Sequence, residues 1–142
     1  MPTIQVRVDN NNQPLVLGSH ARVRTGITIE ASQGDLVAGT VLGEITADPG
    51  VYQVVDHTAV DGSQLPKMIL AEDVADNVAQ QSGISGYESG LFDEGQLVFG
   101  GTTDLDSRLV IETNIDLTMR DALRMFGMFT APAVDLSGYE NA

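Results

Sequence analysis

The chain contains 142 residues, of which 20 are acidic and 7 are basic, so its formal net charge is −13. This charge argues against nucleic acid or an anionic membrane as a direct partner, because binding to either depends on lysine and arginine neutralising phosphates. The length predicts one domain, and the absence of cysteine excludes disulfides and thiolate chemistry. We also expect no spanning helix, since no apolar run approaches 18 residues. The N-terminus has neither a basic region nor an apolar core, so we expect no secretory signal.

Residues 1–24 predict two short strands around a polar loop. Residues 3–8 alternate with their apolar side chains on one face, and residues 15–17 form a second apolar run. The two strands form either a hairpin that caps the domain or an extended arm that pairs with a partner by strand addition. We favour the arm, whose candidate contact residues are Thr3, Ile4, Gln5, Val6, Arg7, Val8, Leu15, Val16, Leu17, Arg22 and Arg24.

The charge of this N-terminal segment differs from that of the rest of the chain. Its first 25 residues carry three arginines (Arg7, Arg22 and Arg24) and one acid, Asp9, whereas the remainder is strongly acidic. The asymmetry indicates either a basic arm that meets an acidic or polar partner surface or solvated arginines on an edge strand.

Residues 21–30 alternate again and predict the first strand of the domain proper. Residues 34–71 then contain short apolar runs, each ended by a turn such as 48–50 (Asp-Pro-Gly) or 61–62 (Asp-Gly). Strands are expected at 51–55 and 68–71. Short runs of β-branched residues that are bounded by glycine, proline and aspartate at this spacing are typical of a compact barrel or sandwich.

Residues 74–90 are polar, contain three glycines and have few large apolar side chains. We expect a surface excursion here, with one helical turn over residues 73–80. Tyr87 either anchors a neighbouring subunit or packs on its own domain, and with Leu91 and Phe92 it is the candidate subunit interface. Further strands are expected at 96–99 and 109–111.

The C-terminal part predicts one helix. Thr118 is a favourable N-cap, and Asp121 places a negative charge in the first turn. Apolar side chains then recur at helical spacing and predict a core-facing stripe: Ala122, Leu123, Met125, Phe126 and Phe129. Pro132 stops the pattern, and residues 133–142 are expected to be a loose tail.

The chain offers little that points to catalysis or metal binding. Asp56 and His57 beside Asp61 could form a dyad or a metal site, but each is also an ordinary turn residue. Asp104 and Asp106 lack the glycine-centred loop and the further oxygen ligands of a calcium site. No nucleotide-binding, hydrolase or metalloprotease fingerprint occurs. We therefore expect no enzyme activity, no catalytic residue, no metal and no cofactor.

Several motifs in this order resemble the lambda phage head decoration protein family. They are residues 38–43 (AGTVLG), a strand with Tyr52, residues 61–64 (DGSQ), an apolar strand ending at 69–71 (ILA), and the helix after residue 118. The resemblance covers about residues 25–128. Biotinyl and lipoyl carrier domains use similar glycine turns, but they need an exposed hairpin lysine, whereas Lys67 follows a proline at the start of an apolar strand.

The resemblance implies a mainly β fold: a small barrel-like domain of short strands (β-tulip type) with one C-terminal helix and an extended N-terminal arm. The implied organisation is an arm over residues 1–24, a decoration domain over 25–130 and a tail over 131–142.

The resemblance also implies a structural, non-enzymatic capsid cement protein. It would bind the expanded head as a homotrimer at threefold sites and stabilise the head against internal DNA pressure. Its partner would be the major capsid protein of the same phage, and its place would be the outer surface of the virion capsid after synthesis in the host cytoplasm. The alternative is a ligand- or glycan-binding β module, or a tail or fibre component of a virion.

Overall fold

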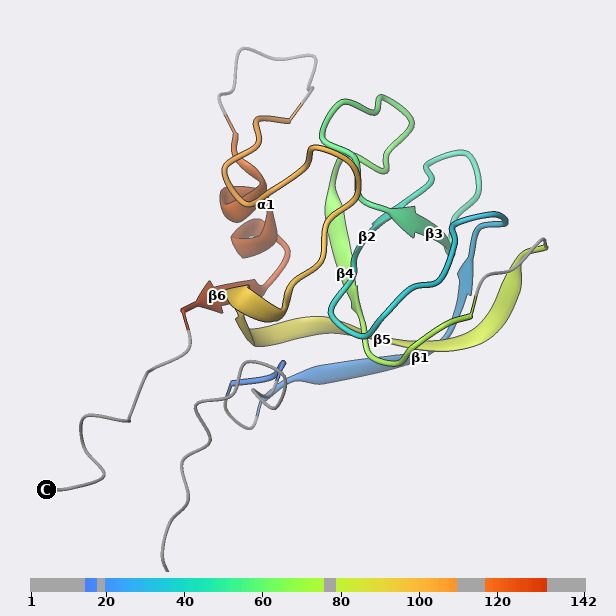
Figure 1. The fold of residues 1–142 in the computed structure, drawn as a ribbon, viewed down its shortest axis with the longest axis horizontal. Coiled ribbons are helices and arrows are strands. Elements are labelled where there is room, and N and C mark those ends of the chain that lie inside the picture. The colour runs from blue at the N-terminus through green and yellow to red at the C-terminus, as the bar shows by residue number, and fades with distance from the viewer. Residues whose placement is uncertain (1–14, 18–19, 76–78, 110–116, 133–142) are drawn as a thin grey trace, which may run out of the picture.

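The computed structural model describes residues 15–17, 20–75, 79–109 and 117–132. Figure 1 shows strands wrapped around a common centre with one α-helix against their side. The elements in chain order are β1 (Arg22–Ile29), β2 (Val41–Glu44), β3 (Val51–Val54), β4 (Pro66–Leu70), β5 (Gln81–Asp93), the 3-10 helix η2 (Glu94–Gln96), α1 (Met119–Met125) and β6 (Met128–Ala131).

Five of the strands close into a barrel. Their hydrogen-bonded order is β1–β3–β2–β4–β5, and β1 pairs again with β5 to complete the ring. The β1–β3 pair is parallel, and the other four pairs are antiparallel. Closure removes the free strand edges that an open sheet would expose. The mainly β, barrel-like fold with a helix near the C-terminus is therefore confirmed, as are the strands expected over residues 21–30, 51–55 and 68–71.

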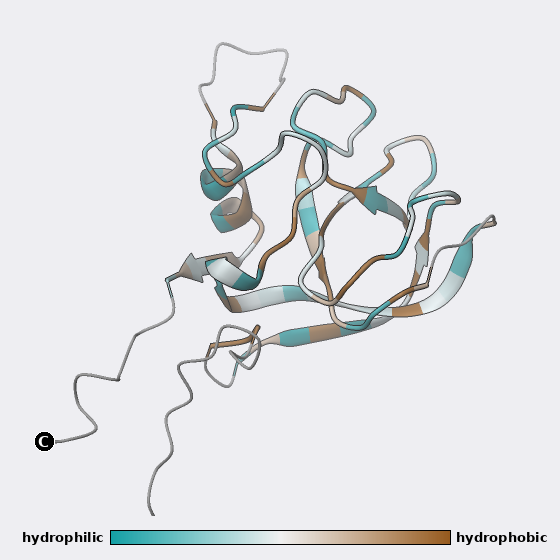
Figure 2. Cartoon of the chain, viewed as in Figure 1, coloured by the Kyte–Doolittle hydropathy of each residue, from teal (hydrophilic) through white to brown (hydrophobic). Residues whose placement is uncertain are grey.

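Strand β4 separates two hydrophobic cores. Successive side chains of a strand point to opposite faces, so Met68 and Leu70 join one core while Ile69 joins the other. Figure 2 shows the hydrophobic segments that β4 contributes at the centre of the molecule. The first core fills the barrel with Ile27, Ile29, Leu36, Leu42, Tyr52, Met68, Leu70, Val74 and Ile84. The second lies between the barrel wall and α1 and contains Val41, Val55, Ile69, Phe92, Leu109, Met119, Ala122, Leu123 and Met128.

The prediction of a surface excursion at residues 74–90 is wrong. Most of this stretch is β5, the longest strand at 13 residues, which pairs with β1, β4 and β6. Two of its three glycines, Gly86 and Gly90, permit close packing against neighbouring elements. A Cβ at Gly86 would lie 2.5 Å from Cγ of Met68. Residues 76–78 lie outside the described part of the chain.

Residues 96–99 do not form the expected strand. Gln96 is the last residue of η2, and the pairing of residues 97–99 is an isolated bridge between Val98 and Thr40. In the expected strand at 109–111, Leu109 is buried in the second core, whereas residues 110 and 111 lie outside the described residues.

The predicted helix begins where expected but ends earlier. Thr118 is the N-cap, and its hydroxyl accepts a hydrogen bond from the Asp121 backbone. The helix ends at Met125, and Gly127, at φ 85°, turns the chain into β6. The core-facing stripe is correct for Ala122 and Leu123 but wrong for Met125 and Phe129, whose exposed fractions are 69% and 52%. Helical spacing does not extend to Phe129 because that residue belongs to a strand.

Candidate functional site

The second half of the predicted arm is held on the body of its own chain. The Leu17 N–H donates to the Leu91 carbonyl at 2.8 Å, and the Asp93 N–H donates to the Leu15 carbonyl at 2.8 Å. Val16 forms an antiparallel bridge with Phe92 and packs, as does Leu15, against the second core. The first half of the arm, residues 3–8, lies outside the described residues.

Arg22 and Arg24 are part of the barrel rather than of a separate segment. Both lie in β1, where Arg22 is opposite Ser89 and Arg24 is opposite Gly86 of β5. Both are exposed, and the guanidinium of Arg22 approaches the carboxylate of Glu88 to 3.4 Å. A boundary at residue 24 therefore falls inside a strand, so a cut there would divide β1.

The three residues predicted for a subunit interface differ in exposure. The Tyr87 ring packs against that of Phe92, with 5.6 Å between the ring centroids. Phe92 is fully buried in its own chain, so its side chain has no surface for a second subunit, and Leu91 is 40% exposed. Of the three side chains, that of Leu91 is the most exposed. It lies beside Leu17 on one strand and Phe129 on another.

The glycines of the two sequence motifs mark a place where backbones cross closely. A Cβ on Gly43 in β2 would lie 2.6 Å from Cα of Ser63, and one on Gly62 would lie 2.6 Å from the Glu44 carbonyl oxygen. Gly62 also has a φ of 105°, which L side chains rarely adopt. The loop with residues 61–64 thus packs directly on β2. This close packing explains why each of the two motifs has a glycine at the point of contact.

Asp61 shapes the same loop. Its carboxylate accepts hydrogen bonds from the Ser63 hydroxyl and backbone N–H and from the side chain of Gln53. The hydrogen bonds from Ser63 lower the pKa of Asp61 below its usual value, with a smaller contribution from Gln53. The Asp61 carboxylate therefore stabilises the turn at residues 61–64.

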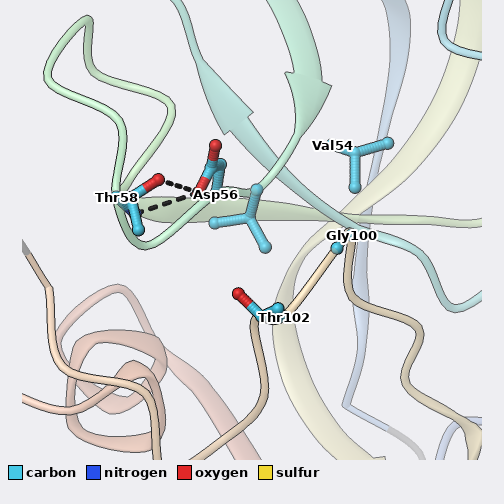
Figure 3. Close-up of a pocket in the computed structure, with 7 residues that line it drawn as sticks. Val54, Asp56, Thr58, Gly100 and Thr102 are labelled. Atoms are coloured by element: carbon cyan, nitrogen blue, oxygen red, sulfur yellow. Dashed lines mark hydrogen bonds between the residues drawn. The ribbon is translucent and has the colours of Figure 1, made fainter.

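A surface hollow of about 400 Å³ lies near this loop and is lined by Val54, Val55, Asp56, Thr58, Gly100, Gly101 and Thr102. Figure 3 shows the Asp56 carboxylate bonded to Thr58, from which it accepts hydrogen bonds at 2.9 Å and 2.7 Å. These bonds from Thr58 lower the pKa of Asp56. The His57 ring forms a hydrogen bond with Thr103, with 2.8 Å between Nδ1 of His57 and Oγ1 of Thr103. Asp56, His57 and Asp61 thus all serve as turn residues.

Metal-binding clusters and membrane-spanning helices are both absent from the part of the chain that the structure describes. There, no group of three or more histidine or acidic side chains is arranged to hold a metal ion. None of the helices in that part has the length and apolarity needed to cross a membrane.

The family comparison decides what this barrel is. The family model for bacteriophage lambda head decoration protein D matches residues 6–112. The chain belongs to this head decoration family. The match spans all five barrel strands and both glycine motifs, and it begins within the predicted arm. The resemblance inferred from those motifs is therefore confirmed, whereas no curated protein matches the chain.

Membership fixes the general role of the chain. The family consists of structural capsid proteins of bacteriophages, so the chain is a head decoration protein that is located on the virion capsid. Residues 117–132, which contain α1 and β6, lie beyond the matched range but pack on the barrel through the second core.

Proposed function

We propose that three copies of this chain form a non-enzymatic cement that binds the major capsid protein on the outer surface of the expanded head. The trimer sits at local threefold sites and opposes the pressure of the packed DNA. The observation that carries this proposal is the family match over residues 6–112, which includes the barrel and much of the N-terminal segment.

The geometry of the body supports a clamp. A closed barrel with two buried cores is a stiff support. Residues 1–14 join that support at Leu15. The Leu15 carbonyl accepts a hydrogen bond from Asp93 of β5, and the next residue, Val16, forms a bridge with Phe92 of β5. We propose that residues 3–8 add as a strand to an open sheet edge of the shell, where main-chain hydrogen bonds give affinity and alternate side chains give specificity.

Three such arms on one trimer would bind jointly. Linking weak contacts on one body raises the overall affinity by about 10²–10⁴ when all can engage together, and the gain is lost when the geometry forbids it. A 14-residue segment reaches at most about 50 Å. The spacing of the three docking points then allows the trimer to distinguish an expanded shell from an unexpanded one.

Co-sedimentation with undecorated heads of the cognate phage tests the proposal. The full chain should saturate expanded heads and bind unexpanded heads weakly. A chain without residues 1–14 should keep its fold but bind expanded heads at least about 100-fold more weakly, because the joint contact of the arms is lost. This cut is preferable to one at residue 24, since it spares β1 and the bridge at Val16.

Two results would contradict parts of the proposal. Equal binding to both kinds of head would refute recognition of the expanded state. Equal binding by the full and shortened chains would place the contact on the body alone. Sedimentation equilibrium of the released protein, together with the number of copies bound per head, tests the trimer separately.

A further inference from the structure

The described N-terminal residues and the C-terminal strand meet at the end of β5, where residues 15–17 form an isolated bridge rather than a full strand. The end of β5 pairs on one side with residues 15–17 and on the other with β6. Leu17 is opposite Leu91 in the antiparallel pairing, and Leu91 is in register with Phe129 in the parallel pairing. Cross-strand neighbours in register share a face of the sheet. Leu17, Leu91 and Phe129 therefore form one row, the outer apolar row.

The two faces of this sheet have different environments. Phe92 and Met128 alternate with the row and point to the second core, where both are fully buried. Leu91 and Phe129 remain 40% and 52% exposed, and Leu17 is half-buried. Two residues further along β5 than Leu91, at Asp93, the same face of the sheet is covered. Asp93 is 2% exposed, and its carboxylate accepts a hydrogen bond from Gly95 of η2.

The row also lies beside an open strand edge. Within the described residues β6 pairs with β5 alone. Edge strands are usually protected by charged side chains, proline or a bulge, but β6 has the sequence MFTA and contains none of these. An apolar row beside an unprotected edge is typical of a surface that a partner covers.

The chain outside the described region indicates which partner. Leu17 follows residue 14 by three positions, so it lies within about 10 Å of the base of the arm. If the arm is bound to the shell, the body surface at its base is held close to the shell as well. We propose that the outer apolar row packs against an apolar segment of the major capsid protein. This inference rests on the proposed function and assigns a body contact in addition to the arm.

Site-directed cross-linking tests the contact directly, because the chain has no cysteine and an introduced one is unique. A Phe129→Cys variant is labelled with a maleimide–benzophenone, bound to expanded heads and irradiated. The expected product joins this chain to the major capsid protein. A product made only of two copies of this chain would show that the row is a subunit interface and would overturn the inference, as would the absence of any shell product.

Val60→Cys is the matched control. Val60 is 79% exposed, in the loop between β3 and β4, which Figure 1 shows on the opposite side of the molecule from residues 15–17 and β6. It should label equally well and give much less shell product. Equal shell products from both positions would overturn the inference, because the row would then have no special proximity to the shell.

A second variant measures the contribution of the row to binding. Leu91→Thr combined with Phe129→Thr keeps residues that favour strands but reduces the apolar surface. We expect about a tenfold or greater rise in the concentration that half-saturates expanded heads, with an unchanged circular dichroism spectrum and solution mass. Unchanged binding by this folded variant would overturn the inference but leave the proposed function intact. Failure of the wild-type chain to bind heads would instead refute the proposed function.

Discussion

At the residue scale, the family motifs are explained by contacts between backbones. Gly43 lies where the loop at 61–64 crosses β2, and Ser63 at the crossing is fully buried. A Gly43→Ala substitution would force the two backbones apart, since a Cβ would lie 2.6 Å from Cα of Ser63. We expect the free energy of unfolding to fall by about 1–3 kcal/mol, as in other overpacked interiors, and urea unfolding measures it.

Gly95→Ala is the matched control for this substitution. A Cβ at Gly95 would meet only the end of the Asp93 side chain, at 3.3 Å. The control should change the unfolding free energy much less than Gly43→Ala. Equal losses in the two variants would mean that the close crossing at Gly43 is not the cause.

Asp61 predicts how stability depends on pH. Its hydrogen bonds with Ser63 lower its pKa in the folded protein below the unfolded value of about 4. The ionised carboxylate therefore stabilises the fold above the unfolded pKa, and this contribution disappears as the pH falls through the lower folded value. In Asp61→Asn the loss of stability between pH 5 and pH 2 should be smaller than in the wild type, as measured by the urea midpoint at each pH.

Asp48→Asn serves as the control, because it removes an exposed acid from the turn between β2 and β3. A change in the profile that Asp61→Asn shows and Asp48→Asn does not is assigned to the carboxylate that Ser63 hydrogen-bonds. An Asp61→Asn profile parallel to that of the wild type would contradict the assignment to Asp61.

At the element scale, the sequence predicted the elements whose signals are local. β1, β3 and β4 have apolar runs bounded by turns, and α1 has a polar N-cap. β5 escaped prediction because its three glycines and polar side chains are typical of a loop. Its partners are distant in sequence, and Gly86 is needed there to admit Met68. Phe129 was wrongly assigned to the helix. The chain turns at Gly127, and beyond it the side chains follow the two-residue period of a strand.

The same distinction applies to the candidate site. The motifs that identify the family are contiguous in sequence, so they were visible without a structure. The outer apolar row joins Leu17, Leu91 and Phe129 from three distant segments. No local spacing links these residues, and only the pairing of the strands brings them to one face.

The start of α1 offers a prediction at this scale. The Thr118 hydroxyl accepts a hydrogen bond from the Asp121 N–H at 3.3 Å and donates one to the Asp121 carboxylate at 3.0 Å. A Thr118→Ala substitution should lower the free energy of unfolding by about 1 kcal/mol, whereas Thr118→Ser should retain most of the stability. Thermal unfolding of the three proteins measures both effects, and equal losses in the two variants would argue against a role for the hydroxyl.

At the scale of the whole molecule, the boundary between arm and body determines how the protein can work. The strand pairing of residues 15–17 assigns them to the body, although the sequence pattern grouped them with residues 3–8. If the arm ends at residue 14, it can be removed without loss of core packing. If it extends to residue 17 or beyond, binding to the shell would have to detach part of the body.

Two truncations distinguish these possibilities. Removal of residues 1–14 should leave the free energy of unfolding within about 0.5 kcal/mol of the full chain, because no strand of the barrel is cut. Removal of residues 1–17 also takes away Leu15 and Val16, which pack on the second core, and the two hydrogen bonds to Leu91 and Asp93. We expect this loss to cost about 2–4 kcal/mol. Urea unfolding of the three proteins measures both effects, and two equally stable truncations would show that residues 15–17 belong to the arm.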